Sequence, residues 1–330
     1  MGGWNKTKGY ILKKQICDEE IWAVFNYIFS TRCMKRNTYK FAIIKAILDN
    51  LFNVVAYNDL RFISYSDLFE KFSINYWNLV AKYNIKQMRR DGKSELSQIE
   101  KIIYKIIEKN PEIKKLEFDS LEYKDKCYII EGATKVCKRN VFGALYDDSS
   151  GCFFQFDIMG DGIYLNECYY QFMLQNKFVL EKLNYYGWAK FIETINDDIS
   201  IVRLLEKLEL ATPKRKDLSS FRDVLRTEFG QNKCFYCEKQ LGDLCHVDHF
   251  LPWVFIKDDK LWNFVLSCKS CNNRKKEKLP NLEDLDKIVK RNKDLSHLKN
   301  DIVSNDFKDY NEEFIRLLYK YALKCGFKCR

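Results

Sequence analysis

The 330-residue sequence is poor in proline and glycine, with 4 Pro and 13 Gly. Both residues interrupt regular helices, so their scarcity favours a helix-rich protein. No run of about 18 apolar residues occurs, which argues against a membrane-spanning helix. The start of the chain also lacks the apolar stretch of a secretory signal peptide. We therefore expect a cytoplasmic protein whose cysteines stay reduced.

Apolar and basic residues, by contrast, are plentiful. Hydrophobic residues make up 46% of the chain and aromatic residues 15%, which is enough for buried cores and argues against disorder. The formal net charge of +10 suits a polyanionic partner, because lysine and arginine release counterions from phosphates. Charge alone does not decide the matter, since a merely soluble basic protein has the same balance. The length predicts two or three compact units.

The first part of the chain, residues 1–125, shows apolar residues at helical spacing. The three stripes span residues 41–51, 69–83 and 96–107. The last is stopped by Asn110-Pro111, because the residue before a proline disfavours helical geometry. We expect a helical domain here, serving recognition or partner docking.

Residues 126–215 are expected to form a mixed α/β middle region. Its β-prone runs are residues 127–130, 141–146 and 152–156. Asp147-Asp148-Ser149-Ser150-Gly151 separates two of these runs as the turn of a hairpin, and a helical stretch follows to about Ile192. The polar, basic segment 211–217 contains a proline and marks the main boundary. Residues 216–330 then form the last domain, and the fold class is α+β.

Four of the 13 cysteines form two CxxC pairs, Cys234/Cys237 and Cys268/Cys271. The 30 residues 238–267 separate the two pairs. In a reduced compartment, two such pairs can give four thiolates to one tetrahedral Zn²⁺. A single pair would be equally compatible with a redox dithiol. Four thiolates leave no open coordination position, so the predicted zinc site is structural.

Two of the three histidines, His246 and His249, lie between these pairs. Asp248 places a hard carboxylate directly beside His249, and carboxylates suit Mg²⁺ or Mn²⁺. An imidazole with a near-neutral pKa is suited to deprotonating water. Phosphodiester hydrolysis needs both a nucleophile made from water and positive charge on the phosphate.

Taken together, residues 230–280 resemble the HNH endonuclease family, also called the His-Me finger nucleases. That family's core reads roughly CxxC, then Asp-His with a proline close behind, an asparagine before a short strand, and CxxCN with basic residues. The matching positions here are Cys234/Cys237, Asp248-His249, Pro252, Asn263, Cys268/Cys271 and Asn272. The resemblance implies a zinc-stapled β-hairpin followed by a helix.

The resemblance also implies a role for each matching residue. His249 would be the general base, and Asp248 and Asn272 would hold one catalytic Mg²⁺ or Mn²⁺. Asn263 would brace the loop between the two strands and orient His249. The third letter of the family name is often a histidine, and Asn272 stands in its place. Basic residues on or just after the helix would lie near substrate phosphates: Arg274, Lys275, Lys276 and Lys278.

Each residue has a simpler alternative. His246 is a rival base or metal ligand, although a strand residue facing away from His249 is the simpler interpretation. Cys245 is expected to be a core thiol, and His297 a surface helix residue. Asn273 replaces Asn272 as the ligand if the register slips by one. The basic cluster by default is a solvated face.

We therefore expect a DNA endonuclease, with double-stranded DNA as its substrate. The alternative is a zinc-stapled nucleic-acid-binding module, or a partner-binding subunit of a larger complex, without cleavage of its own. An unregulated nuclease harms its cell, so the preceding residues suit a regulatory or ATPase partner. They loosely resemble helical extensions on HNH proteins of bacterial antiphage defence and restriction. One HNH site cuts one strand, so a double-strand break would call for a homodimer or two nicks.

Overall fold

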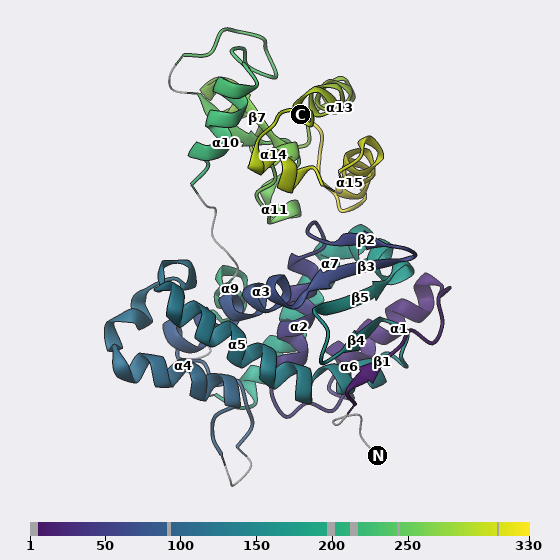
Figure 1. The fold of residues 1–330 in the computed structure, drawn as a ribbon, viewed down its shortest axis with the longest axis vertical. Coiled ribbons are helices and arrows are strands. Elements are labelled where there is room, and N and C mark those ends of the chain that lie inside the picture. The colour runs from purple at the N-terminus through teal and green to yellow at the C-terminus, as the bar shows by residue number, and fades with distance from the viewer. Residues whose placement is uncertain (1–5, 91–93, 197–201, 212–216, 243–244, 309) are drawn as a thin grey trace. The chain divides into compact units, whose positions relative to one another are not determined.

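The computed structural model describes residues 6–90, 94–196, 202–211, 217–242, 245–308 and 310–330 (Figure 1). The chain divides into two compact units, Met1–Lys214 and Arg215–Arg330. The segment predicted as the linker includes residues 212–216, which lie outside the described residues. The architecture is α+β and mainly helical, as the sequence predicts. No described helix is both long and apolar enough to cross a membrane.

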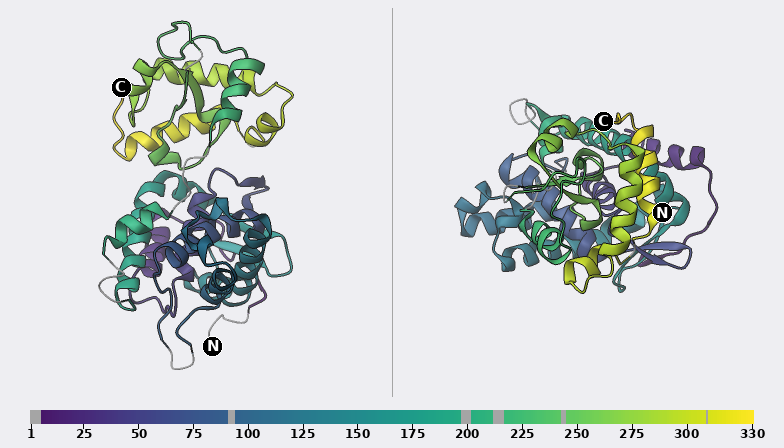
Figure 2. Two further views of the ribbon diagram at one scale, coloured as in Figure 1. Left: turned by 90° about the vertical axis from the view of Figure 1, so that its left-hand side faces the viewer. Right: turned by 90° about the horizontal axis from the view of Figure 1, so that it is seen from above.

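The first unit combines helices with an antiparallel sheet (Figures 1 and 2). Its described α-helices are α1 (Asp18–Phe29), α2 (Tyr39–Asp49), α3 (Tyr65–Trp77), α4 (Gln98–Lys109), α5 (Tyr123–Asn140), α6 (Phe142–Asp148), α7 (Glu167–Glu193) and α9 (Leu204–Leu210). Its described strands are β1 (Lys8–Gly9), β2 (Val55–Tyr57), β3 (Leu60–Ser64), β4 (Phe154–Asp157) and β5 (Gly162–Asn166). They are ordered β1-β4-β5-β3-β2.

Helix α4 illustrates how local sequence sets these elements. The Ser97 side chain accepts the backbone N–H of Glu100, and the Glu100 carboxylate accepts that of Ser97, which forms a capping box. Apolar residues at helical spacing are buried on one face, and the helix ends before Pro111. The predicted helical stripes over 41–51 and 96–107 are therefore confirmed. The stripe over 69–83 becomes α3 and a following π-helical turn, Asn78–Lys82.

The middle region differs from the sequence prediction. Residues 127–130 lie within α5 and residues 142–146 within α6, so two of the three predicted β-prone runs are wrong. In α5 the residues Ile129, Ala133 and Cys137 are buried four positions apart, and packing of that helical face overrides the local β-propensity.

A hairpin does exist in the middle region, but its strands are β4 and β5, with Phe156 opposite Ile163. Its turn comes after Asp157, whereas the predicted turn 147–151 comprises the last two residues of α6 and the start of the loop to β4. Strand β3 pairs with β5, and β1 pairs with β4. Residues before and after position 125 thus share one sheet within one unit.

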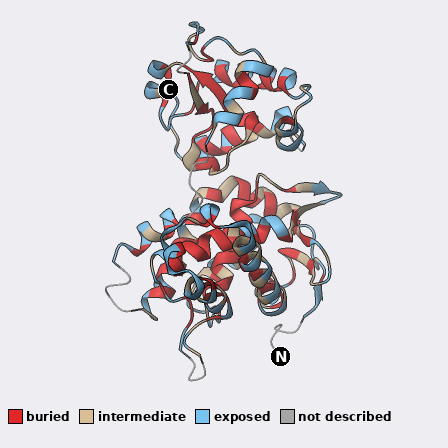
Figure 3. Cartoon of the chain, turned by 60° about the vertical axis from the view of Figure 1, so that its left-hand side comes forward, coloured by how far each residue is buried: buried red, intermediate tan, exposed pale blue. Residues whose placement is uncertain are grey.

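The second unit is built around a two-stranded antiparallel hairpin. Its described strands and α-helices are α10 (Ser219–Asp223), β6 (His246–His249), α11 (Trp253–Ile256), β7 (Phe264–Ser267), α12 (Lys269–Lys275), α13 (Leu282–Leu295), α14 (Asp301–Asp306) and α15 (Glu312–Lys324). Helix α10 is followed directly by a π-helical turn, Val224–Glu228. Each unit buries its own apolar core, drawn in red in Figure 3.

Candidate functional site

The β6–β7 hairpin and helix α12 carry the residues singled out in the sequence. Asp248 pairs with Val265 and His249 with Phe264, so the predicted general base and the predicted carboxylate ligand both lie on β6. Neighbouring residues of a strand point to opposite faces, and this separates the carboxylate from the imidazole. Helix α12 follows β7 and packs against β6. This is the strand–strand–helix arrangement that the sequence predicts.

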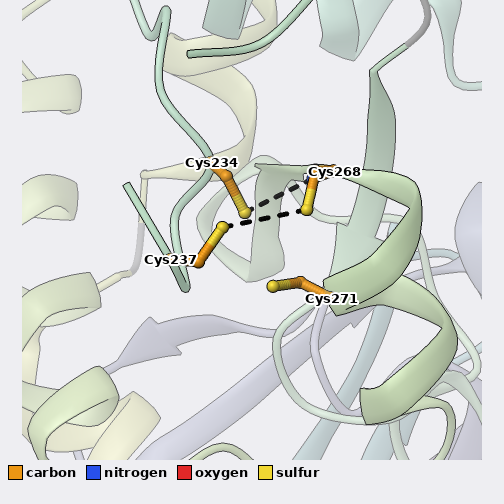
Figure 4. A group of neighbouring side chains, drawn as sticks. All are labelled: Cys234, Cys237, Cys268 and Cys271. Atoms are coloured by element: carbon orange, nitrogen blue, oxygen red, sulfur yellow. Dashed lines mark hydrogen bonds between the residues drawn. The ribbon is translucent and has the colours of Figure 1, made fainter. Parts of the chain in front are cut away.

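The four predicted zinc ligands converge at one point (Figure 4). Cys234 and Cys237 come from the loop before the hairpin, while Cys268 and Cys271 come from the start of α12. Their sulfur atoms all lie within 4.8 Å of one another, and the Cys237 and Cys268 sulfurs are 3.8 Å apart. Zn–S bonds of about 2.3 Å in a tetrahedron need sulfurs roughly 3.8 Å apart. The residues therefore fit a structural zinc ion.

Hydrogen bonds to sulfur favour thiolates in this cluster. The backbone N–H of Cys268 donates to Sγ of Cys234 at 3.3 Å. A hydrogen bond from the backbone of Cys271 lowers the pKa of the Cys268 thiol to about 7. Burial raises the pKa of the Cys271 thiol to about 12, although Arg274 donates to its Sγ at 3.4 Å, a smaller effect that lowers the pKa. Thiolates are the form that binds metal, so these donors support the assignment.

His249 is held in a fixed orientation. Its ring stands edge-on to Trp253 and Phe264, with centroids 5.2 and 4.6 Å away. Its Nε2 atom lies 3.0 Å from Oδ1 of Asp259, and both side chains are 8% exposed. A carboxylate bound to one ring nitrogen selects the tautomer and leaves the lone pair on the other. With Asp259 ionised, Nε2 carries the proton and Nδ1 is the basic atom.

Asp248 is held by a tyrosine and a lysine. The hydroxyl of Tyr236 donates to Oδ2 at 2.6 Å, and the Lys275 ammonium lies 3.4 Å from the same oxygen. Burial, followed by the charge of Asp248, raises the pKa of Tyr236 well above its usual value, so this hydroxyl remains a donor. Both of these contacts are made to Oδ2 of Asp248.

Asn263 lies completely buried at the end of the loop before β7. Its side-chain oxygen accepts the backbone N–H of Leu251 at 2.8 Å, and its side-chain nitrogen donates to the carbonyl of Leu251 at 3.0 Å. Its own carbonyl accepts the N–H of Phe250 at 2.7 Å. These bonds fasten the two residues that directly follow His249. Such a clamp is what the expected bracing role requires.

Asn272 is the middle residue of helix α12 (Lys269–Lys275) and is half-buried. Of the four predicted phosphate contacts, Arg274, Lys276 and Lys278 are exposed. Lys275 is completely buried, and its ammonium donates to the carbonyl of His249 at 2.6 Å. Burial lowers the pKa of Lys275. Lys275 is therefore not a surface contact for phosphates, contrary to the prediction. Its ammonium instead binds the backbone of β6 from the interior of the unit.

The residues weighed as alternatives are also placed. His246 begins β6, half-buried, on the same face as Asp248 by strand alternation. Cys245 is buried in the apolar core and receives a hydrogen bond from Arg226, outside the four-sulfur group. Asn273 is exposed on α12. His297 is exposed in the turn after α13, not within a helix.

Two side chains at the site were not singled out from the sequence, namely Asp259 and Tyr236. Asp259 lies in the loop ten positions after His249, among ordinary surface-type charges at 257–260. Tyr236 occupies the spacer of a CxxC pair, where any residue type is compatible with zinc binding. The sequence alone does not identify a carboxylate or phenol near a motif as a site residue, because the fold decides which group it contacts.

Comparisons with known proteins bear on this unit alone. No curated protein and no solved structure matches the chain. The matched segment of the family model begins at Cys234 of the first CxxC pair and ends at Asn281, the N-cap of α13. It thus contains the four cysteines, the hairpin and every predicted catalytic residue. The family model of HNH endonucleases matches residues 234–281, so the chain carries an HNH endonuclease domain.

Proposed function

We propose that the second unit is a metal-dependent endonuclease that hydrolyses phosphodiester bonds in DNA. The observation that carries the proposal is the His249–Asp259 pair, 3.0 Å apart, with Asp248 preceding His249 on strand β6. The HNH match over residues 234–281 supports nuclease chemistry. A general base next to a hard metal ligand is the minimum that hydrolysis of a phosphodiester by water requires.

In this proposal His249 is the general base. Its Nε2–H donates to Asp259, so Nδ1 takes the proton from the attacking water. Asp259 fixes the tautomer and stabilises the imidazolium that forms, because its charge is opposite and largely shielded from solvent. The flanking rings of Trp253 and Phe264 restrict rotation of the imidazole. The proton of the attacking water is therefore always transferred to Nδ1 of His249.

Asp248 and Asn272 are the proposed ligands of the catalytic ion. They offer a carboxylate and an amide oxygen, the hard donors that Mg²⁺ and Mn²⁺ prefer. Packing of α12 against β6 brings the two elements together. A divalent ion bound there supplies positive charge to the scissile phosphate and to the leaving 3′ oxygen.

Substrate phosphates are proposed to meet the exposed cations of α12 and the turn after it. Arg274, Lys276 and Lys278 are exposed, and unlike Lys275 they can neutralise a backbone from outside. The Asn263 clamp keeps the loop after His249 in place while the backbone binds.

The first unit is proposed to supply recognition or control, in bacterial defence or restriction. Support comes from its size, 214 of 330 residues, and from its own core and sheet. A regulatory or ATPase partner would dock there, and a homodimer would convert single nicks into double-strand breaks. Phage plating on cells that express wild-type or His249→Ala protein tests the biological role. Equal plaque numbers with both would argue against defence.

The function itself is tested by cleavage of supercoiled plasmid by the full chain with Mg²⁺, Mn²⁺ or EDTA. We expect nicking that requires the divalent ion and falls about 10²–10⁴-fold in His249→Ala, because the base is lost. His297→Ala is the matched control, since it removes an exposed histidine outside the site. Cleavage by His249→Ala at the wild-type rate would contradict the proposal.

The second candidate is a zinc-stapled binding module without catalysis, which the four-cysteine cluster by itself would support equally well. It predicts DNA binding by the folded, zinc-loaded chain with no cleavage under any metal. Repeating the assay with proteins co-purified from the native host separates that module from a nuclease that needs an activating partner.

A further inference from the structure

The zinc knuckles and the catalytic carboxylate are connected through Tyr236. This residue lies between Cys234 and Cys237, so the predicted zinc ligands anchor its backbone on both sides. Its hydroxyl donates to Oδ2 of Asp248 at 2.6 Å. A shift of the first knuckle therefore moves the donor that holds Asp248.

The second knuckle reaches the same oxygen through helix α12. Cys268 precedes this helix and Cys271 lies within it, while Lys275 is its last residue. The Lys275 ammonium is 3.4 Å from Oδ2 of Asp248 and also donates to the carbonyl of His249. Asp248 is thus held from both halves of the four-cysteine cluster.

The ring of Tyr236 is fixed by its neighbours. The guanidinium of Arg330 lies 5.0 Å from the ring centroid, and the ring of Phe235 stands edge-on to it at 5.3 Å. The backbone N–H of Phe235 donates to the carbonyl of Leu266 on β7. The phenol is therefore a rigid link between the knuckle and the hairpin.

We propose that Tyr236 is a positioning residue that orients Asp248 for the catalytic divalent ion, so that an assembled four-cysteine site is a condition for binding that ion. The inference rests on the proposed function, in which Asp248 is a metal ligand. Hydrogen bonds to a ligating carboxylate orient it, and their removal typically weakens metal binding about 10- to 100-fold. Zinc loading would then control cleavage as well as folding.

Tyr236→Phe in the full chain tests the proposal, because it removes one hydroxyl and keeps the ring. We expect Mn²⁺ affinity, measured by electron paramagnetic resonance of the free ion, to fall about 10- to 100-fold. Zinc content, measured by mass spectrometry, should stay at the wild-type value. Tyr319→Phe is the matched control, since its buried hydroxyl donates to the carbonyl of Pro280 and should leave Mn²⁺ affinity unchanged.

Wild-type Mn²⁺ affinity in Tyr236→Phe would overturn the inference, and so would a wild-type chain that binds no Mn²⁺. Plasmid nicking is measured in parallel and separates the two proposals. A drop in Mn²⁺ affinity without nicking by any variant counts against the nuclease alone. Nicking that needs His249, with unchanged Mn²⁺ affinity in Tyr236→Phe, counts against the role of Tyr236 alone.

A second measurement covers the case in which Tyr236→Phe loses zinc. With 3-fluorotyrosine placed at position 236, the ¹⁹F resonance should shift as Mg²⁺ is added, because the hydroxyl is hydrogen-bonded to Asp248, the proposed ligand of that ion. The same label at position 319 should not shift. A resonance at position 236 that ignores Mg²⁺ would overturn the proposal without any variant that risks unfolding.

Discussion

Nε2 of His249 lies 3.0 Å from Oδ1 of Asp259, across a loop that contains the short helix α11. Contacts from the C-terminal helices hold this loop. The backbone N–H of Leu261 donates to Asp306 at 2.6 Å, and the side chain of Asn292 donates to the carbonyl of Trp262 at 2.8 Å. The carboxylate that faces the imidazole is therefore positioned by residues beyond the HNH core.

Loss of Asp259 should slow cleavage without weakening substrate binding. We expect Asp259→Ala to lower kcat about 100-fold at unchanged KM, since tautomer selection and imidazolium stabilisation are lost. Asp259→Asn should lower kcat less, about 10-fold, because its side-chain oxygen still accepts Nε2–H. Initial nicking rates over a range of plasmid concentrations separate the two constants.

The matched control is Asp286→Ala, which removes an exposed carboxylate paired with Arg316 on the C-terminal helices. It should cleave like the wild type. An Asp259→Ala chain with wild-type kcat, or one in which only KM changes, would show that the His249–Asp259 contact does not serve the reaction.

Removal of the Asn263 side chain should destabilise the second unit. Asn263→Ala leaves the backbone N–H and carbonyl of Leu251 buried without their partners, at a cost of roughly 2–4 kcal/mol in free energy of unfolding. Urea denaturation followed by tryptophan fluorescence measures this loss. Asn273→Ala changes an exposed amide on α12 and should be neutral. A stable Asn263→Ala chain would contradict the proposed clamp.

Zinc removal should unfold the second unit and leave the first intact. Cys271→Ser, or chelation of the wild type, removes a ligand set that structural zinc sites depend on for folding. Thermal unfolding should lose one transition while the first unit, which has its own core, keeps the other.

Cys245→Ala is the control for that experiment. Cys245 is buried in the same apolar core but lies outside the four-sulfur group, so zinc content should stay at the wild-type value. Equal zinc content in Cys271→Ser and the wild type would show that the cluster does not bind the ion.

The exposed lysines after α12 should set the salt dependence of DNA binding. Each lysine that no longer neutralises a phosphate makes the slope of log K against log salt shallower by about 0.9. We therefore expect a shallower slope in Lys276→Ala and Lys278→Ala, measured by fluorescence anisotropy. Lys275→Met should instead reduce stability, because Lys275 is buried under β6. An unchanged slope in both surface variants would place the substrate elsewhere.

The sequence by itself determined the class of the second unit and the positions of its motif. Two CxxC pairs, Asp248-His249, Asn263 and Asn272 are defined by residue type and spacing, and spacing along a hairpin and a short helix translates directly into geometry. It also predicted α4, because an apolar stripe at helical spacing ends at Asn110-Pro111. The local sequence is sufficient to predict a structural element where the interacting residues lie within one or two helical turns of each other.

Tertiary structure decided the rest. The runs 127–130 and 141–146 are β-prone in isolation, yet residues 127–130 and 142–146 become helical because their apolar faces pack against other helices of the first unit. The pairing of β1 with β4 joins segments far apart along the chain, Lys8 with Asp157, and no local pattern encodes it. The burial of Lys275, the contact of Asp259 with His249 and the bond from Tyr236 to Asp248 likewise depend on where distant segments meet. Sequence spacing therefore names the reactive groups, while the fold selects the neighbours that orient them.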